Sequence, residues 1–120
     1  MKTMRSVLLT ATILGLIFSV AFAAGDAGKG KNLFTDPKAF GGEKACSSCH
    51  PDGKGLENAG AKKEFKIMGK TQKSIEEAVN FCIEHASKGK AIDSKSEKMM
   101  DLVAYIKSLG KKMDKKAAGY

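Results

Sequence analysis

The stretch KACSSCHPDG, residues 44–53, decides how this chain is interpreted. It places two thiols and an imidazole within five positions, namely Cys46, Cys49 and His50. Three kinds of site use cysteines at this spacing: a redox disulfide, a zinc site, and a covalently attached haem. The remainder of the sequence is needed to choose among them.

The disulfide and zinc interpretations each leave part of the pattern unexplained. A redox Cys-x-x-Cys pair is expected between a strand and a helix, but the residues before this motif do not resemble a strand. Zinc could use Cys46 and Cys49 together with Cys82 and His85. The 32 residues between these two pairs exceed the usual finger spacing, and His50 would then have no role.

Covalent attachment of a haem uses every residue of the motif. Cysteines three positions apart can each form a thioether bond with one vinyl group of a porphyrin, and the adjacent histidine can then bind the iron. We therefore expect Cys46 and Cys49 to hold a haem c, with His50 as one axial ligand of its iron. Because the chain contains one such motif, we expect one haem.

The first residues predict export. A positively charged start precedes an uncharged, mostly apolar stretch from Ser6 to Phe22, which ends in the small-x-small pattern Ala21-Phe22-Ala23. We expect residues 1–23 to be a signal peptide, cleaved after Ala23 or Ala24, and the mature protein to be periplasmic. An uncleaved anchor is the alternative, since an apolar run of about 17 residues is at the lower limit for spanning a bilayer.

One small domain, residues 24–110, is expected after cleavage, followed by a lysine-rich tail, residues 111–120. No later apolar segment is long enough for a stable membrane span. Residues 24–120 contain 19 lysines, no arginine and 13 acidic residues, a net charge of +6. Nucleic-acid binding usually relies on arginine, so it is not expected. The lysines fit either solubility or steering toward an acidic redox partner.

Three segments have the hydrophobic spacing of helices. They cover residues 27–34, 71–88 and 94–109. The first places Gly30 and Phe34 on one face. The third is expected to begin at a Ser94 cap and to end at Gly110. Residues 52–70 contain scattered glycines and are expected to form a loop.

The second predicted helix carries the remaining cysteine. Ser74 and Glu77 can form a capping box at its start, with Thr71 as an alternative cap. At about 100° per residue, Cys82 lies near the middle of the apolar stripe and His85 lies at its edge. A lone cysteine in such a stripe is ordinarily a small buried side chain, although a free thiol is unusual in an exported protein.

A helix, the Cys-x-x-Cys-His segment, a loop and two later helices together resemble a small class I cytochrome c. The resemblance covers Gly25 to Leu109. It implies an all-α cytochrome c fold, with helices and loops around one covalent haem. It also implies that the first and last helices cross, with Gly30 and Phe34 meeting Leu102 and Tyr105.

The sequence departs from this family at the sixth ligand of the iron. The usual ligand is a methionine in the loop before the last helix, and residues 89–93 contain none. Met68, Met99 and His85 are candidates. The stretch from Val79 to Ile92 also resembles the haem domain of thiosulfate dehydrogenases and of sulfur-oxidation cytochromes. In those domains a cysteine of this helix binds the iron.

That resemblance implies that Cys82 binds the iron opposite His50. A thiolate pushes electron density onto the metal, so a low reduction potential is expected. The main hypothesis is a periplasmic electron carrier, not an enzyme. Lysines expected near the haem edge are Lys44, Lys54, Lys62, Lys63 and Lys90.

Two other functions stay open. The first is the haem subunit of a thiosulfate oxidoreductase, although the resembling enzymes carry further redox centres and substrate-binding arginines that residues 24–120 lack. The second is a binder of diatomic gases, which requires Cys82 to leave the iron on reduction. A hetero- or homodimer is also left open.

Overall fold

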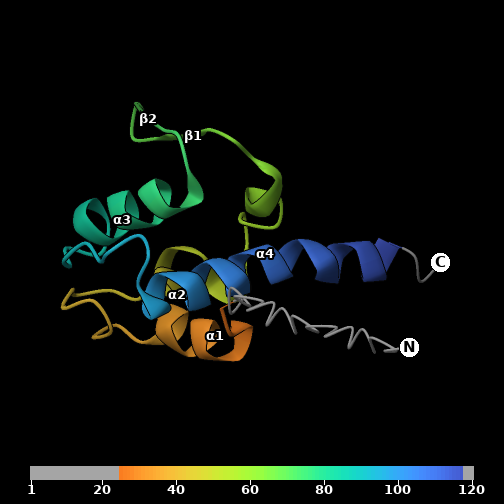
Figure 1. Cartoon of the computed structure of the whole chain (residues 1–120), viewed down its shortest axis with the longest axis horizontal. Coiled ribbons are helices and arrows are strands. Elements are labelled where there is room, and N and C mark those ends of the chain that lie inside the picture. The colour runs from red at the N-terminus through yellow and green to blue at the C-terminus, as the bar shows by residue number, and fades with distance from the viewer. Residues whose placement is uncertain (1–24, 118–120) are drawn as a thin grey trace, which may run out of the picture.

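The computed structural model describes residues 25–117 (Figure 1). The expected signal peptide, residues 1–23, and the last three residues of the expected tail lie outside the described residues. The helices are α1 (Ala27–Thr35), α2 (Cys46–Cys49), α3 (Ile75–His85) and α4 (Glu97–Ala117), with short 3-10 turns at Pro51–Gly53 and Ala59–Ala61. Strands β1 (Phe65–Ile67) and β2 (Lys70–Gln72) form an antiparallel hairpin. The described chain is therefore mostly helical.

Helices α1 and α4, from opposite ends of the chain, lie side by side (Figure 1). A Cβ atom at Gly30 would lie 1.9 Å from the carbonyl oxygen of Asp101, so only glycine allows the two backbones to approach this closely. The rings of Phe34 and Tyr105 pack edge to face, with centroids 5.1 Å apart. Gly30 and Phe34 thus contact α4 at Asp101 and Tyr105.

Side chains from α1, α3 and α4 form one hydrophobic core. Its buried members are Phe34, Phe40, Ile83, Leu102, Tyr105 and Leu109. Full burial of a side chain of this size contributes about 1.5–3 kcal/mol to folding. Because Phe40 precedes α2 and Ile83 lies in α3, this core joins both segments to the α1–α4 pair.

The segment before α3 differs from the prediction. Thr71 belongs to β2, and α3 begins after Ser74, whose Oγ accepts the N–H of Glu77 at 3.1 Å. Met68 and Gly69 have φ angles of 49° and 77°, a left-handed pair that suits a two-residue hairpin turn. The turn pairs Ile67 with Lys70. The expected 52–70 loop therefore contains a strand, and the fold is not purely helical.

The ends of α4 also differ from the prediction. The helix begins at Glu97, because Ser96 and not Ser94 is its cap: Ser96 Oγ accepts the N–H of Met99 at 3.2 Å. It continues through Gly110 to Ala117. An interior glycine costs a helix only about 1 kcal/mol, and the lysines, methionine and alanine that follow are good helix formers. No helix within residues 25–117 is long and apolar enough to cross a membrane.

Candidate haem site

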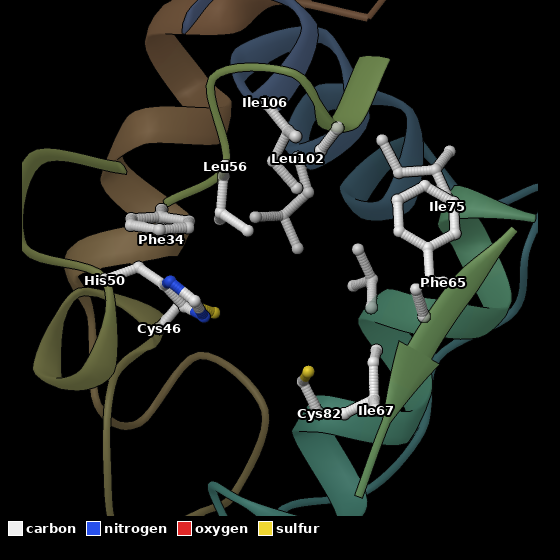
Figure 2. A pocket seen from close by; sticks show the side chains of 13 residues that line it. Phe34, Cys46, His50, Leu56, Phe65, Ile67, Ile75, Cys82, Leu102 and Ile106 are labelled. Atoms are coloured by element: carbon white, nitrogen blue, oxygen red, sulfur yellow. The ribbon is translucent and has the colours of Figure 1, made fainter. Parts of the chain in front are cut away.

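A cleft lies between the segment of α2 on one side and α3 on the other (Figure 2). It encloses about 540 Å³, including its open mouth. Apolar side chains from α1, α3, α4 and β1 line the cleft, together with Leu56 and Ala59 from the segment between α2 and β1. The other lining side chains are Cys46, His50 and Cys82.

One helical turn brings the motif residues together. Cys46 and Cys49 are three positions apart on α2, which places them on neighbouring positions of one face. Cys46 is half-buried and lines the cleft, whereas Cys49 is exposed and is not among the lining residues. His50 ends the helix, and its backbone N–H donates to the carbonyl oxygen of Cys46 at 3.0 Å.

The imidazole of His50 is oriented by a backbone group. Its Nδ1 lies 3.0 Å from the carbonyl oxygen of Lys54. Because a carbonyl oxygen only accepts, Nδ1 carries the proton and Nε2 keeps its lone pair for a metal. The 3-10 turn Pro51–Gly53, with Asp52 at a φ of 54°, folds the chain back to place Lys54 there. Figure 2 shows the His50 ring projecting into the cleft.

Cys82 approaches the cleft from the other side. It lies on α3, and Figure 2 shows its sulfur directed into the space that the His50 ring also faces. Burial raises the pKa of the Cys82 thiol, and the nearby Cys49 adds to the effect. Burial also raises the pKa of the Cys46 thiol to about 11, with a further contribution from Cys82. In the protein alone both thiols therefore stay protonated, and a bound ferric ion would favour the thiolate of Cys82.

The other candidate ligands lie outside this cleft. Met68 is 69% exposed at the hairpin turn, and Met99 is 0% exposed within the packing of α4. The ring of His85 stacks on Phe81 with centroids 4.1 Å apart, and its Nδ1–H donates to the Phe81 carbonyl at 3.1 Å. Of the four proposed sixth ligands, Cys82 is therefore the one that lines the cleft.

The alternative zinc site is not assembled. It would require Cys46, Cys49, Cys82 and His85 to converge, and His85 is exposed and turned toward Phe81. Among the side chains described, residues 25–112, no group of three or more His, Cys, Asp or Glu residues is placed to hold a metal ion.

A pair of backbone hydrogen bonds connects the two sides of the cleft. The N–H of Glu43 donates to the carbonyl oxygen of Ser87 at 2.8 Å, and the N–H of Lys90 donates to that of Phe40 at 2.8 Å. We call these two segments, residues 40–43 and 87–90, the clasp. Gly42 makes this approach possible, because a Cβ there would lie 2.4 Å from the Ser87 oxygen. The clasp ties the chain before α2 to the chain after α3, and so limits how far His50 and Cys82 can separate.

These features fit a haem. The cleft is apolar, as the porphyrin ring requires, and the thiols of the motif lie next to an imidazole with a free Nε2. An imidazole and a thiol on opposite walls are a suitable pair of axial ligands.

The comparison with protein families gives the same result. The family model described as "SoxA/TsdA, cytochrome c domain" matches residues 29–114. The chain belongs to this family. It is thus a small c-type cytochrome that binds haem c covalently, and it resembles the haem domains of sulfur-oxidation cytochromes. Searches of the curated proteins and of the solved structures found no match for the chain.

Part of the cleft wall of this SoxA/TsdA-type cytochrome was not predicted from the sequence. Phe65 and Ile67 line the cleft from β1, within a segment expected to be a loop. The alternation Phe65-Lys66-Ile67, followed by a glycine-containing turn, is a strand signal that could have been recognised. The backbone partner of His50 carries no sequence signal, because any residue at position 54 supplies a carbonyl.

Proposed function

We propose that this SoxA/TsdA-type cytochrome is a periplasmic electron carrier with a single haem c. Cys46 and Cys49 form its thioether bonds, and His50 and Cys82 are the axial ligands of the iron. The observation that carries the proposal is the placement of His50 and Cys82 on facing walls of one apolar cleft (Figure 2).

The bound haem supplies one-electron redox chemistry, and the chain controls its surroundings. The Lys54 carbonyl holds the proton of His50 at Nδ1, which would leave the lone pair of Nε2 free to bind the iron. The apolar lining excludes water and lowers the local dielectric constant. The negative charge of a Cys82 thiolate favours the ferric state, so the reduction potential is low.

The sequence of the described chain favours a function in electron transfer over a function in catalysis. Residues 25–117 contain one haem-attachment motif and no arginine that could hold an anionic substrate. The family match keeps a second function open: this cytochrome as the haem subunit of a sulfur-compound oxidoreductase, with a partner supplying the substrate site. Thiosulfate-dependent reduction of the purified cytochrome alone would favour independent catalysis over the carrier function.

Electron paramagnetic resonance of the ferric protein tests the ligand pair. We expect a low-spin signal with the narrow spread of g values that thiolate ligation produces, and its loss in both Cys82→Ala and Cys82→Met. His85→Gln and Met68→Leu are matched controls, because neither side chain lines the cleft. A signal that persists in Cys82→Ala would refute thiolate ligation, and a pyridine haemochrome assay with a haem-to-protein ratio other than one would refute the single haem.

A further inference from the structure

The positive charge of this cytochrome is concentrated in two segments. Residues 62–73 contain five lysines and one glutamate, and residues 107–116 contain five lysines and one aspartate. Each segment carries a net charge of +4, whereas residues 25–117 as a whole carry +6. The remainder of the described chain is therefore slightly acidic, and the charge is unevenly distributed along the sequence.

The first of these segments covers the haem cleft. We call residues 62–73, which include β1 and β2, the cationic hairpin. Phe65 and Ile67 face inward and line the cleft, and Lys66 between them is exposed. The inner face of the hairpin is therefore part of the haem site, and its outer face and ends carry charge. The exposed lysines are Lys62, Lys63, Lys66, Lys70 and Lys73.

The charge of the hairpin is available to a partner. Among the side chains that the structure describes, those of residues 25–112, the one ion pair joins Lys29 and Glu97 at 3.3 Å, so no hairpin lysine is ion-paired there. Met68 adds an exposed apolar side chain at the turn, with a φ of 49° that a non-glycine residue rarely adopts. An apolar contact ringed by charge matches the usual plan of a protein interface, with an apolar centre and a polar rim.

We propose that the cationic hairpin is the surface on which an acidic redox protein docks to exchange electrons with the haem. A partner bound there is separated from the cleft by a single layer of polypeptide. The lysines would steer the encounter and orient the partner. An anionic membrane is less well matched, because membrane binding also needs buried apolar area, and on the hairpin only Met68 offers a large exposed apolar side chain.

This inference deepens the proposed carrier function and rests on it. One electron would pass from a reduced one-electron donor to the ferric haem, leaving the donor oxidised by one equivalent and the haem ferrous. The test uses fully reduced flavodoxin, an acidic flavoprotein, as a model donor. Stopped-flow absorption measures the second-order rate constant as a function of salt, and calorimetry of oxidised flavodoxin with the ferric protein measures binding without electron transfer.

The key comparison is between two charge reversals of equal size. Lys66→Glu with Lys70→Glu alters the hairpin, and Lys111→Glu with Lys112→Glu alters exposed residues of α4, whose far end lies well away from the hairpin in Figure 1. We expect the hairpin variant to lose about 10-fold or more in rate constant and in affinity at low salt, within the range known for electrostatic steering. The α4 variant should change less than about 2-fold, and the difference should vanish near 1 M salt.

Equal losses in the two variants would overturn the inference, because net charge alone would then explain the rate. No loss in either variant would also overturn it. The inference would also be overturned if the hairpin variant lost sedimentation with anionic phosphatidylglycerol vesicles while its reaction with flavodoxin stayed at the wild-type rate. Electron paramagnetic resonance of the ferric hairpin variant distinguishes failure of the docking proposal from failure of the proposed carrier function. An intact thiolate signal in that variant shows that the haem site itself is unchanged.

Discussion

The clasp leads to a quantitative prediction for Gly42→Ala. The new Cβ would lie 2.4 Å from the carbonyl oxygen of Ser87 and 3.1 Å from the backbone nitrogen of Gly89. Ordinary contact begins near 3.4 Å, so the two segments must move apart by about 1 Å. The atoms that the new Cβ meets, Ser87 O and Gly89 N, both belong to the backbone, which cannot rotate away as a side chain can. The substitution should therefore open the clasp.

Two terms set the size of the effect. Each of the two backbone hydrogen bonds of the clasp contributes about 0.5–1.5 kcal/mol. Overpacking a close contact costs about 1–3 kcal/mol, and opening the clasp relieves part of that cost. We expect the free energy of unfolding to fall by about 2–4 kcal/mol. That is a large fraction of the roughly 5–15 kcal/mol that stabilises a typical domain.

Opening the clasp should also affect the ligands of the iron. It allows α3 to move away from the side of the cleft that holds His50, so the proposed bond between the iron and the Cys82 sulfur should weaken. The measurements are urea denaturation of the holoprotein and the affinity of the ferrous form for carbon monoxide, which competes for the sixth position. We expect a lower denaturation midpoint together with tighter carbon monoxide binding.

The neighbouring glycine supplies the control. Gly41 has a φ of 69°, and no atom lies within 4 Å of an added Cβ. Asparagine tolerates this left-handed conformation, so Gly41→Asn adds a side chain without a clash. It should leave stability and carbon monoxide affinity near the wild-type values. The reasoning would be refuted if Gly42→Ala were as stable as the wild type, or if Gly41→Asn caused an equal loss.

Three further predictions concern the frame around the site. Gly30→Ala places a Cβ 1.9 Å from the Asp101 oxygen, so separation of α1 from α4 should lower the thermal midpoint by several degrees, and an unchanged midpoint would contradict the close packing. Ser74→Ala should cost about 1 kcal/mol in urea denaturation through loss of the α3 cap, whereas Ser94→Ala should cost nearly nothing; similar values would show the caps to be wrongly placed. Met68→Asn should stabilise the hairpin by up to about 1 kcal/mol, because Asn-Gly suits a turn with two left-handed residues, and a destabilised variant would argue against this turn.

The haem chemistry and the two long helices could be predicted from the sequence because each depends on near neighbours. Cys46, Cys49 and His50 are within one helical turn, so their spacing alone indicates the attachment of a haem. The apolar stripes of α3 and α4 follow the same local periodicity. Their ends were less predictable: Ser94 was the expected cap of α4, whereas the structure shows that Ser96 caps it.

The approach of distant segments could not be predicted in this way. Residues 40–43 meet residues 87–90 through backbone groups that every residue possesses, and their sequence does not specify a partner. The same holds for the Lys54 carbonyl that orients His50.

By itself, then, the sequence predicted which side chains bond to a haem and determined which faces of the helices are apolar. Only the tertiary structure shows that His50 and Cys82 lie on facing walls of the cleft and that His85, Met68 and Met99 lie outside it. It also shows that the cationic hairpin forms part of the cleft wall. The physical reason is that side-chain type and periodicity act over a few residues, whereas the walls of the cleft come from segments far apart in the chain. Their relative positions depend on close packing and on backbone hydrogen bonds, which residues of any type can form.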